Sequence, residues 1–472
     1  MLALGLAGCA SSSVPAAAPA APLKPCRVAN VAETAQCGTV RVRESADSSR
    51  TIDLRVIIVP ALTHAPRPDP IVPLAGGPGQ GAAALAGGLS QRYAALRDQR
   101  DLVFIDQRGT GESNGLECAP PPTTADLMGR IFDLRRLATC RGQLARAADL
   151  TKYTTTAAAD DYRHVFDQLG YQTVNLIGVS YGSRMALEIT RRHPGRIRTM
   201  TLDGVVPTNF DFPTTGSVDA DASLNALIDD CEADRDCAEA HPRFRRDVDT
   251  AFNRVSRQAV TATVRDPASG SIEQVPFKRS DLGYATRGLL YGNEAQSLPL
   301  WFQQAAAGNF DALAQAYVRR ARTLDAQISY GLHLSVYCTE DVPFVNWTAA
   351  LKAAEPARLG SFLLDQYRAA CEGWPRSSLD SSFRQPVHSA VPSLLMTGRR
   401  DPVTPPRTAV EVARTLSRSK VVTWPYGGHG TDGLVSGECR TSIMQEFLRT
   451  ADPAAVPINC VSAGRPRPFV LR

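Results

Sequence analysis

The sequence predicts an α/β protein whose mostly parallel, twisted sheet is flanked by helices and interrupted by a mainly helical cap. Strand-like runs alternate with helical patterns up to residue 207, and the same alternation returns from residue 389. Between these two parts the pattern is mostly helical. We therefore expect a leader and linker at 1–24, a first core segment at 25–207, a cap at 208–388 and a second core segment at 389–472.

The first core segment opens with short β-branched runs bounded by Pro, Gly and Asp, at 39–44, 51–62, 70–74 and 101–106. Helical patterns follow at 157–170 and 183–192. The apolar runs at 173–179 and 197–204 are continuous, as is typical of strands covered on both faces.

The cap carries one hairpin-like stretch at 261–275. The second core segment contains two further strands, at 392–398 and 420–425, and a last helix that begins near Cys439. We find no internal repeat in the chain. A core divided by one helical insertion is the expected organisation.

Composition is that of an ordinary globular protein, with 43% hydrophobic and 21% charged residues. The net charge of +5 is small for 472 residues, and the charges are interspersed, so the sequence offers no nucleic-acid footprint. No apolar run reaches the length of a membrane-spanning helix.

The N-terminus resembles part of a bacterial export signal. Leu6-Ala7-Gly8-Cys9 is similar to a lipobox, in which Cys9 would be lipidated, and an Ala/Pro/Ser tether follows it. The alternative is a chance cysteine in an Ala-rich leader. We expect that the start codon lies upstream of this numbering.

The other ten cysteines form an even set that suits five disulfides in an oxidising compartment. Pairing nearest neighbours in the sequence is a hypothesis, because connectivity does not follow from spacing. Metal binding is the alternative, but no C-x-x-C or close histidine partner is present. The expected pairs are Cys26 with Cys37, Cys118 with Cys140, Cys231 with Cys237, Cys338 with Cys371, and Cys439 with Cys460.

Ser180 lies in Gly178-x-Ser180-x-Gly182, between a buried strand and a helix, which is the setting of a nucleophile elbow. Side chains at the flanking positions would collide with the strand or the helix. The alternative is a glycine-rich turn with a capping serine.

A nucleophilic serine needs a base and an acid, expected in the order Ser, Asp, His. His429 follows a predicted strand in a glycine-rich loop, and Asp401 follows the strand before it. A surface histidine and a turn aspartate are the alternatives. Asp432 is the fallback acid, in a worse position to orient the imidazole.

An oxyanion hole needs two N–H donors. Tyr181, after the serine, is one candidate, and Gly77 in the early loop A-G-G-P-G is the other. A phosphate-binding loop is the competing interpretation, but no Lys-Ser/Thr pair follows.

Five motifs in this order resemble the prolyl iminopeptidase and tripeptidyl aminopeptidase family of α/β-hydrolases. They are G-G-P-G at 76–79, D-Q-R-G-T-G at 106–111, G-V-S-Y-G at 178–182, G-R-R-D-P-V-T-P at 398–405 and G-G-H-G at 427–430. The resemblance covers roughly residues 39–450 and implies a serine peptidase of α/β-hydrolase fold without metal or cofactor. Many members have His where this chain has Ala75. We interpret Asp106 as structural support.

An aminopeptidase must pair the substrate ammonium with a carboxylate, because burying that charge alone is costly. Glu340, Asp341 and Glu372 of the cap are the candidates, and the family resemblance favours acids beside a cap cysteine and a C-x-x-W-P motif. The alternative is solvated acids with Trp374 in the core.

We therefore expect an exported bacterial serine aminopeptidase, periplasmic or lipid-anchored, acting on peptides with a free N-terminus. The alternatives are a carboxylesterase on uncharged acyl esters and a lipoprotein that binds peptides without cleaving them.

Overall fold

The computed structural model describes residues 23–429, 434 and 437–472. Cys9, its lipobox and Asp432 lie outside the described residues, so their predicted roles stay predictions. Within the described part, no helix has the length and apolar character needed to cross a membrane.

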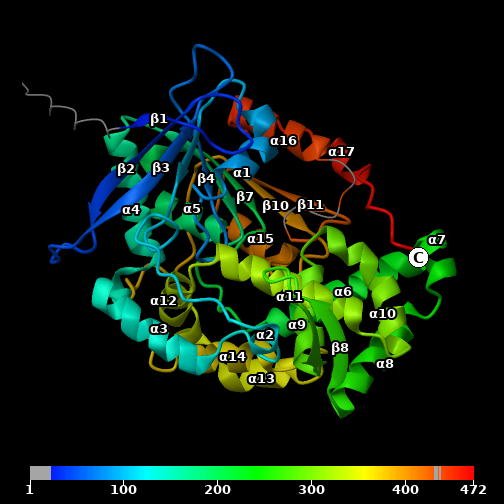
Figure 1. Ribbon diagram of the computed structural model, residues 1–472. Helices are drawn as coiled ribbons and strands as arrows, with labels where there is room; N and C mark the ends of the chain where they lie inside the picture. Colours follow the sequence, from blue (N-terminus) through cyan, green and yellow to red (C-terminus); the bar gives the residue numbers. More distant parts are fainter. Residues whose placement is uncertain (1–22, 430–433, 435–436) are drawn as a thin grey trace, which may run out of the picture.

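A nine-stranded sheet with the order β1-β2-β3-β5-β4-β6-β7-β10-β11 forms the centre of the molecule (Figure 1). The pairs from β1 to β5 at one edge are antiparallel, and all pairs from β5 to β11 are parallel, which confirms the mostly parallel sheet. The strands are β1 Lys24–Cys26, β2 Ala35–Arg43, β3 Thr51–Val59, β4 Ile71–Leu74, β5 Leu102–Ile105, β6 Val174–Val179, β7 Ile197–Asp203, β10 Ser393–Gly398 and β11 Ser419–Trp424.

Helices cover both faces of this sheet. On β6, Leu176 belongs to one apolar core and its neighbour Ile177 to the other, which explains why the apolar run of this strand is continuous. Helices α4, α5 and α15 pack on the first face, and α1, α16 and α17 on the second. Their bounds are α1 Ala86–Arg92, α4 Thr155–Gln168, α5 Tyr181–Arg192, α15 Pro406–Ala413, α16 Glu438–Thr450 and α17 Asn459–Ser462.

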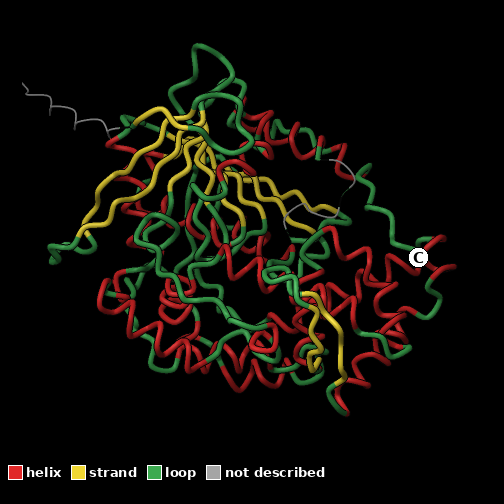
Figure 2. Tube along the Cα trace, viewed as in Figure 1, coloured by secondary structure: helices red, strands yellow, loops and turns green. Residues whose placement is uncertain are grey.

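The chain between β7 and β10 is mainly helical and gathers below the sheet in Figure 1. Its hairpin, β8 Val260–Arg265 with β9 Ile272–Phe277, stands apart from the main sheet (Figure 2). The helices are α6 Gly216–Ala233, α7 Arg235–Ala240, α8 Phe244–Arg257, α9 Arg279–Leu289, α10 Leu298–Ala306, α11 Asp311–Gln327, α12 Tyr330–Glu340, α13 Trp347–Ala354 and α14 Phe362–Cys371. Short 3-10 turns occupy η1 Ala94–Leu96, η2 Leu150–Lys152, η3 Pro194–Arg196, η4 Asn293–Ser297 and η5 Val342–Phe344.

The cap recruits segments from outside 208–388. Leu127 and Met128, at the end of α2 (Thr124–Leu127), share the apolar core of helices α6 and α8 to α11. Phe469 joins the same core, and the Val470 N–H donates to the Gln296 carbonyl at 3.1 Å. Local periodicity does not reveal these additions, because they depend on packing between residues far apart in sequence.

Conversely, α12 and α14 pack into the core under the sheet rather than into the cap core. Val336 of α12 and Trp374 after α14 belong to the same apolar cluster as Leu176 of β6. Helix α3 (Leu134–Ala147) lies against both helices. The predicted cap therefore divides into an outer part with its own core and an inner part that continues the core of the sheet.

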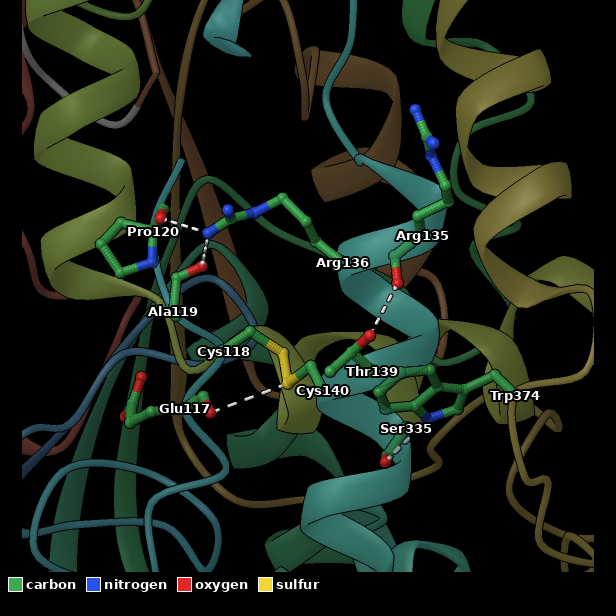
Figure 3. Close-up of a disulfide and its surroundings, with 10 residues drawn as sticks. All are labelled: Glu117, Cys118, Ala119, Pro120, Arg135, Arg136, Thr139, Cys140, Ser335 and Trp374. Carbon is green, nitrogen blue, oxygen red and sulfur yellow. Dashed lines mark hydrogen bonds between the residues drawn. A yellow bond between two sulfur atoms is a disulfide. The ribbon is translucent and has the colours of Figure 1, made fainter. Parts of the chain in front are cut away.

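All ten described cysteines form disulfides in the expected pairs: Cys26–Cys37, Cys118–Cys140, Cys231–Cys237, Cys338–Cys371 and Cys439–Cys460. Figure 3 shows Cys118–Cys140, which ties the loop after β5 to α3. Arg136 of α3 donates to the carbonyls of Ala119 and Pro120 in the same loop (Figure 3). Trp374 donates to the Ser335 hydroxyl at 3.1 Å, so the predicted C-x-x-W-P tryptophan is a buried packing residue.

Candidate active site

Ser180 occupies the turn between β6 and α5 with φ 57° and ψ −125°, a conformation that non-glycine residues rarely adopt. Its N–H donates to the Asp203 carbonyl at 2.9 Å, so β7 holds the turn. A Cβ on Gly178 would lie 2.3 Å from the Gly182 carbonyl oxygen, and one on Gly182 would lie 2.2 Å from that of Leu74. The glycines are therefore required sterically, as the sequence indicated.

His429 and Asp401 meet beyond the ends of β11 and β10. The imidazole Nδ1 lies 2.8 Å from Oδ2 and 3.0 Å from Oδ1 of the carboxylate. Asp401 also accepts from the N–H groups of Val403 and Thr404, each at 2.8 Å, and from the Thr404 hydroxyl at 2.7 Å. The carboxylate is thereby fixed, and it assigns the proton of the neutral imidazole to Nδ1.

The pKa values of this pair move apart. Burial alone would lower the pKa of His429, but the charge and hydrogen bond of Asp401 outweigh it and raise that pKa to about 9. Burial would raise the pKa of Asp401, and the imidazole with the Thr404 donors lowers it instead. The arrangement stabilises an imidazolium beside an ionised carboxylate, which is what a proton-accepting histidine requires.

The cap holds the histidine loop in place. The His429 N–H donates to the Tyr291 carbonyl at 2.8 Å, and the two rings meet edge to face with centroids 4.9 Å apart. Tyr291 follows α9, so a residue of the insertion positions the imidazole.

Ser180 and His429 line one cavity of about 390 Å³ between the sheet edge and the cap. Phe212, Tyr337 and Tyr367 form an aromatic wall, with Phe212 stacked on Tyr337 at 4.8 Å and meeting Tyr367 edge to face at 4.9 Å. The cavity has the size and apolar lining of a small-molecule or short-peptide site.

The predicted oxyanion donors line the same cavity. Tyr181 is the first residue of α5, where N–H groups have no intrahelical acceptor, and Gly77 lies in the loop after β4. Gly77 has φ 109°, and its carbonyl accepts from the Tyr337 hydroxyl at 3.3 Å. Gly76 approaches the serine as well, since a Cβ there would lie 3.4 Å from the Ser180 Cβ.

The D-Q-R-G-T-G segment contacts residues next to this site. Asp106 accepts from the Ala83 N–H at 2.7 Å, just after the glycine loop. Gln107 donates to the Tyr181 hydroxyl at 3.1 Å, and Arg108 forms a buried ion pair with Asp161 at 2.6 Å. These contacts agree with the structural role expected of Asp106.

The three cap acids lie in different surroundings. Glu340 is fully buried outside the cavity lining, and its carboxylate accepts from the N–H and the hydroxyl of Thr155, both at 2.6 Å. Glu372 is exposed and also outside the lining. Asp341 lines the cavity and accepts from Arg184 Nη1 at 2.7 Å. Of these three acids, only Asp341 lines the cavity.

The sequence interpretation missed the basic side chains of the cavity. Arg184, one turn after Ser180, lies 2.7 Å from Asp341 and 3.8 Å from Glu340. Arg287 of α9 and Arg320 of α11 also line the cavity. An arginine on an amphipathic helix carries no local signal that separates it from a solvated one, so only the tertiary structure identifies them. The described residues contain no cluster of three potential metal ligands.

Comparison with protein families gives two matches. The alpha/beta hydrolase fold family matches residues 69–229, and the TAP-like protein family matches residues 356–460. The first region contains β4 to β7 with Ser180, and the second contains Asp401 and His429.

Two of the curated relatives match over most of the chain, and a third matches a shorter part. Tripeptidyl aminopeptidase of Streptomyces coelicolor is 23% identical over 404 residues, 78% of this chain and 71% of the relative. Serine protease Hip1 of Mycobacterium tuberculosis is 25% identical over 386 residues, 73% of this chain and 72% of the relative. Proline iminopeptidase of Neisseria gonorrhoeae is 29% identical over 136 residues, 29% of this chain and 32% of the relative.

Among solved structures, proline iminopeptidase of Mycobacterium smegmatis has a TM-score of 0.43 at 17% identity, covering 89% of this chain and 100% of that one. The two family matches, the parallel sheet and the glycine-flanked serine after β6 agree on one assignment. The chain has the α/β-hydrolase fold, and its residues 356–460 match the TAP-like protein family.

Proposed function

We propose that this protein is a serine aminopeptidase that hydrolyses peptide bonds near free N-termini, of prolyl or tripeptidyl type. The observation that carries the proposal is the position of Asp341. Its carboxylate lines the same cavity as Ser180 and His429 and has one buried oxygen, Oδ2, without a hydrogen-bond partner among the described residues.

The charges around Asp341 favour an incoming ammonium group. Two buried carboxylates, Glu340 and Asp341, face one buried guanidinium, Arg184, which cannot neutralise both acids when both are ionised. Burial raises the pKa of Glu340 to about 7 and that of Asp341 to about 6, although Arg184 opposes both shifts. A substrate ammonium at Asp341 Oδ2 would supply the missing positive charge.

In the proposed reaction the Ser180 hydroxyl attacks the scissile carbonyl while His429 Nε2 takes its proton. The N–H groups of Gly77 and Tyr181 stabilise the oxyanion of the tetrahedral intermediate. His429 then protonates the departing amine, which leaves an acyl-enzyme on Ser180. Water, deprotonated by the same imidazole, attacks this ester and releases the acyl product with regeneration of the serine hydroxyl. Asp401 orients the imidazole throughout, and neither a metal nor a cofactor takes part in this scheme.

The relatives support peptide substrates, since the curated matches include proteins named tripeptidyl aminopeptidase, serine protease and proline iminopeptidase. Five disulfides support the further proposal of an exported, periplasmic protein. Attachment to a membrane through a lipidated Cys9 is part of this proposal and rests on the lipobox resemblance.

The proposal is tested with aminoacyl and tripeptidyl anilides that carry a free amine, with N-acetylated forms of the same compounds, and with short acyl esters. We expect cleavage of the free-amine anilides by the wild type and none by Ser180→Ala. Asp341→Asn should raise KM for free-amine substrates, since the ammonium loses its charged partner. Glu372→Gln is the matched control, because Glu372 is exposed outside the cavity.

Equal cleavage of free and acetylated anilides would contradict the aminopeptidase proposal, and cleavage of esters alone would indicate a carboxylesterase. A protein that cleaves nothing and whose Ser180 resists a fluorophosphonate would be a binding protein.

A further inference from the structure

Arg287 is a buried cation that has no counterion among the described residues. It is only 6% exposed, lines the cavity of Ser180 and His429, and its Nε has no hydrogen-bond partner in the part of the chain that the structure describes. Across the described residues we find neither a hydrogen bond nor an ion pair for its guanidinium. Its guanidinium carbon instead lies 5.5 Å from the ring centre of Tyr291 and 5.9 Å from that of Phe212.

Other buried arginines of the chain are paired with acids. Arg108 meets Asp161 at 2.6 Å, and Arg184 meets Asp341 at 2.7 Å. Because a buried charge without a partner is costly, Arg287 is the exception among the buried arginines that the structure describes, and it needs an explanation. The cation–π contacts offset part of that cost but leave the N–H donors unused.

A second cation, Arg320, lines the same cavity and contacts the same tyrosine ring. The guanidinium carbon of Arg320 lies 4.2 Å from the ring centre of Tyr291, and its side chain crosses Gly288, where a Cβ would meet Arg320 Cδ at 2.4 Å and Nε at 2.5 Å. No carboxylate within the described chain forms an ion pair with Arg320. Gly288 thus leaves the space that brings this guanidinium to the cavity.

The groups that act electrostatically on Arg287 are tyrosines: Tyr284, Tyr291, Tyr337 and Tyr367. Tyr291 responds to the local positive charge. Burial would raise the pKa of its hydroxyl, but Arg287, His429 and Arg320 together lower it. This end of the cavity, next to the His429 ring, therefore favours negative charge.

We propose that Arg287 and Arg320 bind a carboxylate of the substrate, so that the cavity selects acidic substrates. The inference deepens the proposed function and rests on it for the identity of the substrate as a peptide. Asp341 would take the ammonium, and the two arginines would take the carboxylate. The carboxylate belongs either to an acidic side chain or to the free C-terminus of a short peptide, and both have the planar geometry that guanidinium groups recognise.

The first experiment measures how glutarate slows the labelling of Ser180 by a fluorophosphonate, with uncharged glutaramide as the matched probe. We expect glutarate to protect the wild type at a concentration about tenfold or more below that of glutaramide, because charge-assisted hydrogen bonds require the carboxylate. Arg287→Met and Arg320→Met should each remove most of this preference, and Gly288→Ala should weaken it by displacing Arg320. Arg449→Met, which removes an exposed surface charge, should leave it unchanged.

The second experiment identifies the source of the carboxylate. Free-amine peptides that carry Glu or Gln next to the scissile bond, each with a free or an amidated C-terminus, are compared by kcat/KM. A preference for Glu assigns an acidic side chain, and a preference for the free C-terminus assigns the terminal carboxylate. Both preferences should fall in Arg320→Met.

Equal protection by glutarate and glutaramide in the wild type would overturn the inference, as would an unchanged preference in both Met variants. If Arg287→Met is no longer labelled at all, the preference for glutarate over glutaramide is measured in Arg287→Lys, Arg320→Met and Gly288→Ala, and these variants decide the outcome. The labelling experiment does not need peptide cleavage, so failure of the aminopeptidase proposal and failure of this inference are separate outcomes.

Discussion

Nδ1 of His429 lies 2.8 Å from Oδ2 of Asp401, and the same carboxylate receives three further hydrogen bonds from Val403 and Thr404. The acid is therefore held independently of the histidine. A carboxylate that cannot rotate away keeps the imidazole in one tautomer, with Nε2 available to accept a proton.

Replacing Asp401 by Asn should lower kcat by about 10⁴-fold with little change in KM, because the amide no longer selects the productive tautomer. Steady-state kinetics on the preferred anilide measures this. Glu411→Gln, on the exposed face of α15, is the control and should behave as wild type. A loss of tenfold or less in Asp401→Asn would argue that another acid orients His429.

The rate should rise with pH over a range above the ordinary pKa of histidine. His429 accepts a proton only when it is neutral, and Asp401 outweighs burial to raise the pKa of the imidazole to about 9. The midpoint of kcat/KM against pH should therefore lie above about 6.5 in the free enzyme. Asp401→Asn should move that midpoint to lower pH. A wild-type midpoint below about 6.5, or no shift in the variant, would contradict this electrostatic account.

Gly182→Ala should destabilise the protein by about 3 kcal/mol, because its Cβ would lie 2.2 Å from the backbone oxygen of Leu74 and β4 would have to shift. Labelling of Ser180 should fall as well. Gly142→Ala is the matched control, since it lies inside α3 with nothing within 4 Å of the new methyl group. That variant should gain up to about 1 kcal/mol in thermal or denaturant unfolding. Equal stabilities of the two variants would show that the turn tolerates a side chain.

Removing the Cys338–Cys371 disulfide by a double Ala substitution should cost more stability than removing Cys26–Cys37. The two bridges close loops with sequence separations of 33 and 11 residues. The chain-entropy model gives about 4 and about 3 kcal/mol for these loops. Guanidinium unfolding of both variants measures the difference. Loss of Cys338–Cys371 should also slow labelling of Ser180, because α12 carries Asp341 at its end and contributes to the cavity wall. An unchanged labelling rate would show that contacts other than this disulfide hold the cap helices in position.

The sequence was sufficient to predict the elements that depend on interactions between residues close in the chain. The strands around Ser180 were predicted from uninterrupted apolar runs, and β6 and β7 form within a residue of the expected bounds. The elbow was predicted because two glycines at fixed spacing have a steric cause that acts over a few residues. The pairing of Asp401 with His429 followed from chain order, since both come after parallel strands whose carboxyl ends meet at one edge.

The cap could not be divided correctly from sequence alone. Leu127 and Phe469 belong to its core although they lie on either side of the predicted boundaries. Glu340 was an expected amine ligand, yet Thr155, 185 residues earlier, donates to both of its oxygens. Such contacts depend on which helices pack together, and hydrophobic periodicity describes only which face of a helix is buried.

By itself, then, the sequence determined the fold class, the glycine-flanked serine and the order of the residues proposed as the triad, because each follows from short-range sterics and strand order. Only the tertiary structure decided which charged side chains at the cavity form pairs. It paired Arg184 with Asp341 and left Arg287 and Arg320 facing tyrosines. Charge pairing between distant helices is set by packing, so the charges that line the cavity follow only from the tertiary structure.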